Sequence, residues 1–317
     1  RLIKSVKKRL SDPTVSSHYS PQHIVEIKNT LRDDILTIGF ARRFATYKRA
    51  HLLFRDLDRL AAIVNNPKRP VQFLFAGKAH PADKAGSDLI KKIVDISKMP
   101  QFIGKIVFVP NYDINVAKYL VQGVDVWMNN PTRPLEASGT SGEKAAMNGV
   151  MHFSVLDGWW VEGYKEGAGW MLPMERSYDN QGFQDELDAA TIYNIIEGEI
   201  APMYYDKDEK GISSPWIETI KNCVANVACN FTTNRMMEDY IRQYYLPLAK
   251  RASKLVAKEY AVAKEIAEWK KKMRREWPMI EVLSSSNVGN MSGALLLNNE
   301  YKAEMTLSVG EADPQDI

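Results

Sequence analysis

Short apolar runs recur along the first half of the chain, each followed by a stretch with the periodicity of a helix, and this alternation limits the possible folds. We expect strands at residues 35–40, 71–76, 105–109, 124–128, 151–155 and 169–172, and helices at 47–65, 82–97, 115–122 and 143–148. A buried strand that is followed by a helix and then by another buried strand is typical of parallel pairing. The pattern therefore predicts an α/β fold with a doubly wound, Rossmann-like parallel sheet.

The composition is that of an ordinary globular chain. The 317 residues are 45% hydrophobic, and 42 basic against 39 acidic residues leave a net charge of only +3. Such a balance does not favour binding to nucleic acid or to a membrane surface, and no apolar run is long enough to cross a bilayer. Cys223 and Cys229 are predicted to be core thiols of a helix, and the five histidines are scattered. We expect no metal site and a cytoplasmic location.

The chain is predicted to contain four regions. Residues 1–32 form leading helices, 33–182 the sheet, 183–277 helices only, and 278–317 the start of a truncated β-rich domain. Within the last two regions we expect helices at 184–197, 215–228, 233–246 and 248–276, and strands at 280–283 and 301–309. The long charged helix carries apolar residues that we expect to be exposed.

Basic residues gather where the first predicted strand ends. Arg42 and Arg43 follow it directly, and Lys48 comes shortly afterwards. Open α/β sheets bind ligands at the carboxyl ends of their strands. Cations near a helix start oppose the helix dipole by about 0.3–1 kcal/mol each, so we expect an anion such as phosphate to compensate them. A solvated basic turn is the alternative.

A run of small residues precedes Lys144 in the segment RPLEASGTSGEKAAMNG, residues 133–149. A flexible small-residue loop that leads into a helix allows backbone N–H groups to surround an anion, and Lys144 is expected in the first turn of that helix. An amine beside a phosphate cradle is what pyridoxal phosphate requires. The alternative is a surface lysine after a flexible loop.

Four segments together resemble the carboxyl-terminal lobe of the α-glucan (glycogen or starch) phosphorylases, most closely the short bacterial type. They are GFARRFATYKRAHLLF, VQFLFAGKAHPADKAG, VFVPNYDINVAKYLVQGVDVWMNNPTRPLEASGTSGEKAAMNG and VLDGWWVEGY. The likeness extends over about residues 1–277. It implies the carboxyl-terminal lobe of a two-lobed GT-B glycosyltransferase fold, with an amino-terminal lobe as its partner.

The resemblance also implies roles for individual residues. Lys144 matches the lysine that forms a Schiff base with pyridoxal 5'-phosphate. The other cofactor-binding residues would be Arg42, Tyr112, Thr140 and Ser141. Catalysis and binding of the substrate phosphate would involve Arg43 and Lys48. Hydroxyls of the glucosyl unit would contact Glu136, Ser138 and Gly139.

The activity that the resemblance implies is phosphorolysis of α-1,4-glucans. Glucan and inorganic phosphate would give α-glucose 1-phosphate with retention of configuration, and we expect this lobe to be inactive alone. No second carboxylate stands at a spacing that suggests glycoside hydrolysis. The chain departs from the family pattern at Glu143, where most relatives carry methionine, and Ala45 and Asp113 replace a histidine and an arginine of the long-form enzymes.

Two other functions remain open from the sequence. A nucleotide-sugar glycosyltransferase of the same architecture would use the cations for a diphosphate but would have no use for a Schiff-base lysine. A non-catalytic lobe could bind glucan without a cofactor. The oligomeric state, including a homo-oligomer, is equally open.

Overall fold

The structure is a computed structural model that describes residues 1–12, 19–173, 178, 180–288 and 300–317. The chain divides into two compact units, Arg1–Arg235 and Met236–Ile317. Most of the loop predicted between residues 283 and 301 lies outside the described residues, as does His18. The division into two units does not test the four predicted regions, which stay a prediction.

The first unit is built on a six-stranded parallel sheet with the order β3-β2-β1-β4-β5-β6. Its strands are β1 (Leu36–Ala41), β2 (Val71–Ala76), β3 (Ile106–Val109), β4 (Val126–Asn129), β5 (Met151–Val155) and β6 (Gly169–Leu172). Every residue of β1 to β5 is buried, as expected of a parallel sheet covered on both faces. The predicted parallel sheet is confirmed, and β2, β5 and β6 have the predicted bounds.

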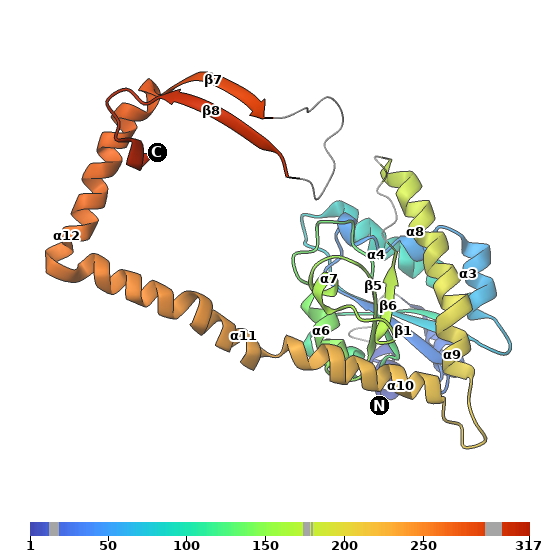
Figure 1. Ribbon diagram of the computed structural model, residues 1–317. Coiled ribbons are helices and arrows are strands. Elements are labelled where there is room, and N and C mark those ends of the chain that lie inside the picture. The colour runs from blue at the N-terminus through green and yellow to red at the C-terminus, as the bar shows by residue number, and fades with distance from the viewer. Residues whose placement is uncertain (13–18, 174–177, 179, 289–299) are drawn as a thin grey trace. The chain divides into compact units, whose positions relative to one another are not determined.

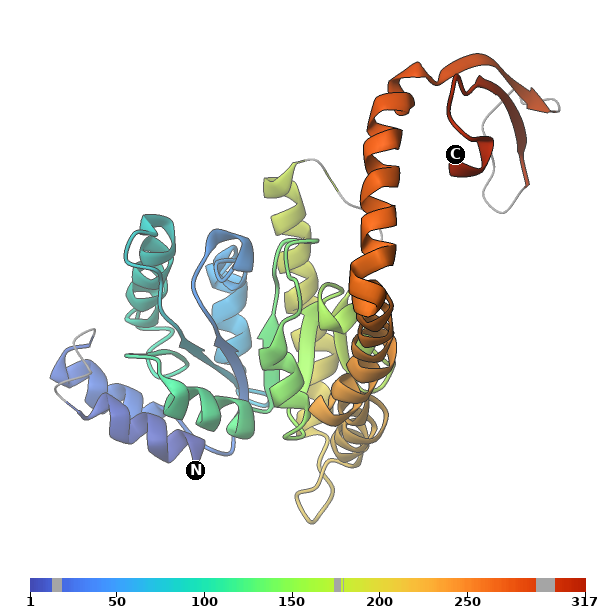
Figure 2. The ribbon, with the colours of Figure 1, turned by 90° about the vertical axis from the view of Figure 1, so that its left-hand side faces the viewer.

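Helices cover both faces of this sheet (Figures 1 and 2). One face packs against α3 (Leu57–Val64), α4 (Lys84–Ser97) and α8 (Gln181–Ile195). The other face packs against α1 (Leu2–Leu10), α2 (Pro21–Thr30), α5 (Ile114–Gly123) and α6 (Thr140–Ala146). This Rossmann-like arrangement brings the strand ends, and the loops that follow them, to one edge of the sheet.

A smaller apolar cluster forms beside α6. It joins Trp159 and Trp160 of α7 (Trp159–Gly163) to Cys223 and Val227 of a π-helical segment, Cys223–Val227, that continues α10 (Ser214–Asn222). A second π-helical segment, Ile196–Ile200, joins α8 to α9 (Ala201–Tyr205). Cys223 is buried as predicted, but the prediction of a core thiol was wrong for Cys229, which is exposed in the 3-10 turn Ala228–Phe231.

Two helix predictions near the sheet edge were wrong. The predicted helix 47–65 is two 3-10 turns, Thr46–Lys48 and Leu52–Phe54, followed by α3. Arg49 has a left-handed backbone (φ 48°), which ends the first turn, and the Asp56 side chain accepts from the N–H of Arg59 to begin α3. The helix predicted at 143–148 begins at Thr140, after Gly139 at φ 89°. Lys144 therefore lies in the second turn of α6, not in the first.

The second unit contains a long helix and a hairpin. The segment α11 (Thr233–Tyr240) crosses the boundary between the units and leads through the π-helical stretch Ile241–Tyr245 into α12 (Leu246–Glu276). Residues 257–260 interrupt α12 with non-helical backbone angles. Strands β7 (Glu281–Val288) and β8 (Lys302–Ser308) pair antiparallel, close to the predicted positions.

Apolar exposure in this unit matches the expectation from the sequence. The exposed large side chains include Tyr244, Tyr245, Leu246, Leu248, Trp269 and Trp277. Within the described ranges, no helix is both long and apolar enough for a membrane crossing.

Candidate functional site

The direction in which successive strands are added reverses between β1 and β4. From β1 the sheet continues through β2 and β3 on one side and through β4, β5 and β6 on the other. At such a reversal the loops after the two strands diverge, and ligands bind in the crevice outside their carboxyl ends. Arg42 directly follows β1, and residues 130–139 connect β4 to α6. The two segments selected from the sequence therefore meet at the reversal point.

A buried ion cluster joins these two segments. Arg42 Nη2 lies 3.0 Å from Glu136 Oε1 and 2.9 Å from Oε2, and Lys48 Nζ lies 2.5 Å from Oε2. The three side chains are only 6–10% exposed. The backbone N–H of Glu136 donates to Asp157 Oδ2 at 2.9 Å, which fixes the loop after β4 against the loop after β5. Sequence reasoning selected all three cluster residues but did not predict that they pair.

The cluster has more positive than negative charge. Two cations face one carboxylate, and Arg42 Nε and Nη1 are buried without a hydrogen-bond partner among the described residues. Burial lowers the pKa of Arg42, and the Glu136 carboxylate opposes that shift. Buried donors without acceptors are costly, by about 1–3 kcal/mol or more for a charged group. An anion placed against the guanidinium would satisfy them.

Arg43 takes a different position from Arg42. Its side chain is exposed and lies close enough to the phenol of Tyr47 to influence its pKa, as does Lys48. Burial raises the pKa of Tyr47, but the neighbouring Lys48 and Arg43 outweigh this effect and lower it overall. Lys48 Nζ also lies 4.5 Å from the centre of the Tyr47 ring. Tyr47, which the sequence did not single out, thus links Arg43 to the buried cluster.

The helix α6, which carries Lys144, begins beside this cluster. A Cβ atom at Gly139, which precedes α6, would lie 3.6 Å from Glu136 Oε1, so the start of the helix adjoins the cluster. Lys144 is exposed, and its Nζ donates to Thr140 Oγ1 at 3.3 Å. The hydroxyl of Ser141 accepts from Trp127 Nε1 of β4 at 3.2 Å, so it is directed toward the sheet. Because α6 has only seven residues, its dipole is short and the cations carry most of the local field.

Two buried polar side chains beside α6, His152 and Trp159, were not selected as site residues from the sequence. Both ring nitrogens of His152 and the Nε1 of Trp159 have no partner among the described residues. Burial, together with the charge of Arg42, lowers the pKa of His152 to about 3. A Cβ at Gly142 would lie 2.6 Å from His152 Cε1 and 2.7 Å from Trp159 Nε1, so α6 packs closely on both rings. In the sequence, His152 stands within a strand and Trp159 stands beside Trp160, and neither position indicates this contact with α6.

Arg49 is a further residue that the sequence did not indicate. It is 3% exposed, and its Nη1 contacts Asp185 Oδ1 at 3.0 Å and Asp188 Oδ2 at 2.6 Å of α8. Its Nε and Nη2 donate to the carbonyls of Asn130 and Pro131, at 2.9 and 3.0 Å. This guanidinium holds the loop that carries Glu136 against α8. An arginine directly after Lys48 looked like part of one basic run.

The remaining selected residues lie at the edges of the site. Tyr112 follows β3, two strands away from β1, and packs against the apolar cluster that includes Ala145 of α6; burial raises its pKa. The carbonyl of Ser138 accepts from the N–H of Trp159 at 2.7 Å. Within the ranges that the structure describes, no group of three or more His, Cys, Asp or Glu could hold a metal ion.

Comparison with known proteins identifies the family of the chain. The model of the carbohydrate phosphorylases matches residues 15–169, which include the whole ion cluster and α6. A glycogen phosphorylase of Aquifex aeolicus is 47% identical over 250 residues. The chain belongs to the carbohydrate phosphorylase family.

Other phosphorylases of this family are similar to larger or smaller parts of the chain. A maltodextrin phosphorylase of Thermococcus litoralis is 46% identical over 251 residues, or 79% of this chain. A glycogen phosphorylase of Mycobacterium tuberculosis is 34% identical over 316 residues, or 100% of this chain. The matches cover 36%, 30% and 36% of the Aquifex, Thermococcus and Mycobacterium proteins. This phosphorylase-family chain therefore spans about a third of the length of the curated relatives it matches.

Proposed function

We propose that the chain is the phosphate- and cofactor-binding lobe of an α-glucan phosphorylase. The protein would split α-1,4-glucans with inorganic phosphate to give α-glucose 1-phosphate, with retention of configuration. The observation that carries the proposal is the buried cluster at the reversal point of the sheet, where Arg42 and Lys48 share Glu136 and Arg42 keeps unpaired donors. The names of the relatives, glycogen and maltodextrin phosphorylase, support a glucan as substrate.

The residues around α6 fit pyridoxal phosphate. Lys144 is exposed and would hold the aldehyde of the cofactor covalently, while the free donors of Arg42 and the start of α6 would face its phosphate. Thr140 would support Lys144 through its hydroxyl, and Tyr112 would border the ring. When bound, the cofactor would supply a second phosphate group that exchanges a proton with inorganic phosphate.

The cations would allow two phosphates to occupy one pocket. Two unit charges at 4 Å repel each other by about 4 kcal/mol at an effective dielectric constant near 20. Arg42 on one side and Arg43 with Lys48 on the other would offset this repulsion. Arg43, which is exposed beside Tyr47, would be free to turn toward an arriving substrate phosphate.

Glu136 would change partners when the anions bind. Its carboxylate now neutralises Arg42 and Lys48, and phosphate would replace it there. The freed carboxylate would then accept hydrogen bonds from glucosyl hydroxyls, together with groups of Ser138 and Gly139. Protonated phosphate would donate to the leaving glycosidic oxygen, and the resulting anion would stabilise the developing positive charge on the sugar before bonding to the same face.

The lobe would belong to a larger, cytoplasmic enzyme. The Rossmann-like unit would be one half of a two-lobed GT-B enzyme, and an amino-terminal lobe would close the crevice over the glucan. We place the protein in the cytoplasm, where phosphate and storage glucans meet.

The test uses the complete protein with maltoheptaose and phosphate as substrates. We expect formation of glucose 1-phosphate, and we expect Lys48→Ala to raise the KM for phosphate at least tenfold while cofactor absorbance is retained. Lys68→Ala is the matched control, because Lys68 is exposed in the loop before β2. That loop lies at the amino-terminal ends of the strands, opposite to the end that carries the site. Equal KM values in the two variants, or glucosyl transfer from a nucleotide sugar in place of phosphorolysis, would contradict the proposal.

A further inference from the structure

A pocket of about 530 Å³ lies beside β6, away from the ion cluster. It is lined by the segment from Tyr164 to Met171, by Pro173, and by residues of α8, the π-helical segment, α9 and α10. Its volume is within the range of small-molecule sites, about 300–1,000 Å³. None of its lining residues belongs to the candidate functional site.

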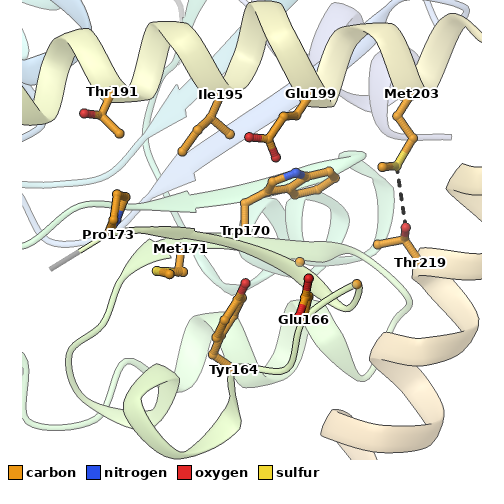
Figure 3. A pocket seen from close by; sticks show the side chains of 12 residues that line it. Tyr164, Glu166, Trp170, Met171, Pro173, Thr191, Ile195, Glu199, Met203 and Thr219 are labelled. Atoms are coloured by element: carbon orange, nitrogen blue, oxygen red, sulfur yellow. Dashed lines mark hydrogen bonds between the residues drawn. The ribbon is translucent and has the colours of Figure 1, made fainter. Parts of the chain in front are cut away.

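Aromatic and polar groups converge in this pocket. Figure 3 shows the indole of Trp170 across its middle, with Glu199 above it and Tyr164 and Glu166 below. Trp170 is 6% exposed and lies beside Trp216, with ring centres 6.0 Å apart and the rings tilted by 37°. Its indole N–H donates to no described residue. The pocket thus contains an indole donor for which the described residues supply no acceptor, and its nitrogen lies on the side of the ring that faces Glu199 (Figure 3).

The carboxylates are also without partners. Glu166 and Glu199 are exposed, and neither forms an ion pair or hydrogen bond with another residue in the ranges that the structure describes. Both act on Tyr164, whose pKa is raised first by burial and further by the charges of Glu166 and Glu199. The polar groups of the pocket therefore offer several acceptors and few donors.

The residues that line the pocket indicate which class of ligand it can bind. Among the described residues that line it, none is a lysine, arginine or histidine, which argues against phosphates, nucleotides and other anions. Two carboxylates argue against a purely apolar ligand. A ligand rich in hydroxyl groups fits, since its O–H groups would donate to Glu166 and Glu199, its oxygens would accept from Trp170, and its C–H faces would pack on the aromatic rings.

We propose that this pocket binds a neutral oligosaccharide, an α-glucan segment, at a distance from the residues that perform the chemistry. The choice of an α-glucan rests on the proposed function, whereas the choice of a neutral sugar rests on the lining alone. Such a site would hold the protein on a long glucan while chain ends exchange at the active site.

Fluorine NMR tests the proposal in the complete protein. All tryptophans, which include the seven of this chain, are replaced biosynthetically with 5-fluorotryptophan, and the resonances of Trp170 and Trp159 are assigned with Trp170→Phe and Trp159→Phe. Trp159 reports on the candidate functional site, because its Cδ1 lies 3.4 Å from the position of a Cβ at Gly139. We expect maltohexaose to shift the Trp170 resonance saturably.

Exposed carboxylates provide the variants, because their replacement does not disturb the core. Glu199→Ala removes a charged acceptor and is expected to weaken maltohexaose binding at Trp170 about tenfold or more. Glu199→Gln keeps an acceptor oxygen and is expected to retain most of the affinity. Glu162→Ala is the matched control, since Glu162 is exposed on α7 but does not line the pocket.

The outcomes separate this proposal from the proposed function. No shift of Trp170 with maltohexaose, or equal affinities for Glu199→Ala and Glu162→Ala, would overturn the pocket assignment even if phosphorolysis occurs. A shift with choline that Glu199→Gln abolishes, without one for maltohexaose, would overturn it in favour of an organic cation. A specific maltohexaose shift in a protein without phosphorolysis would support the pocket and refute the proposed function.

Discussion

Replacing Glu136 with glutamine removes the one negative charge of the buried cluster while preserving its shape. Arg42 and Lys48 are 10% and 9% exposed at their side chains, and both pair with this carboxylate. Loss of one partner from a buried ion pair typically costs about 3–5 kcal/mol, because a charge remains buried without compensation. The glutamine oxygen still accepts one hydrogen bond, so we expect about 3 kcal/mol. For a unit of 150–250 residues this corresponds to a decrease in Tm of about 6–12 °C.

Phosphate should reverse much of this loss. An anion bound between Arg42 and Lys48 replaces the missing carboxylate, and saturation at about 100 times its Kd contributes about 2.7 kcal/mol. The assay is thermal unfolding at constant ionic strength, with phosphate exchanged for chloride. We expect phosphate to raise the Tm of Glu136→Gln more than that of the unmodified protein, in which Glu136 competes for the same cations.

Glu197→Gln is the matched control for this experiment. Glu197 pairs with Arg59 at 2.5 Å on the surface, with side chains 39% and 31% exposed. Exposed pairs contribute about 0–1 kcal/mol, so the Tm should fall by no more than a few degrees and should not respond specifically to phosphate. If both variants lose the same stability, or gain equally from phosphate, the argument for an anion site at the cluster is refuted.

The surroundings of α6 give two further predictions. The pKa of His152 lies near 3 when folded and near 6.5 when unfolded, so the unfolded state binds the extra proton; the unfolding free energy should fall by up to about 1.4 kcal/mol per pH unit between pH 6.5 and 3. Urea unfolding at several pH values across this range measures the slope. We expect His152→Phe to reduce it, and an unchanged slope in this variant would contradict the prediction. Gly142→Ala places a Cβ 2.6 Å from His152 Cε1 and should lower the free energy of unfolding by about 1–3 kcal/mol. Gly198→Ala is the control, because nothing lies within 4 Å of its new Cβ, and it should cause no measurable loss of stability. Equal effects in the two variants would count against close packing at Gly142.

The strands of the sheet were predictable because both of its faces are buried. A fully buried strand shows as a continuous apolar run, and β2 (Val71–Ala76) was predicted with its actual bounds. The end of the first strand then identified Arg42 and Lys48 as candidate site residues, whereas Glu136 was indicated by the family resemblance. Their mutual pairing could not be predicted, because it depends on side chains that approach across 88 and 94 residues of sequence.

Local backbone geometry accounts for most of the errors. Gly139 adopts a left-handed conformation just before α6, so the helix begins among residues that look like a flexible loop. The left-handed backbone of Arg49 likewise breaks a stretch with good helical periodicity. The role of Arg49 follows from two aspartates of α8 that lie 136 and 139 residues away. A single sequence carries no sign of such distant contacts.

The attachment of the cofactor tests the central claim most directly. The complete protein is reduced with borohydride, digested, and its peptides are analysed by mass spectrometry for a pyridoxyl phosphate adduct. The account predicts one adduct, on Lys144, which is absent in Lys144→Ala and retained in Lys48→Ala. An adduct on another lysine, or no adduct in a protein that still produces glucose 1-phosphate, would contradict it.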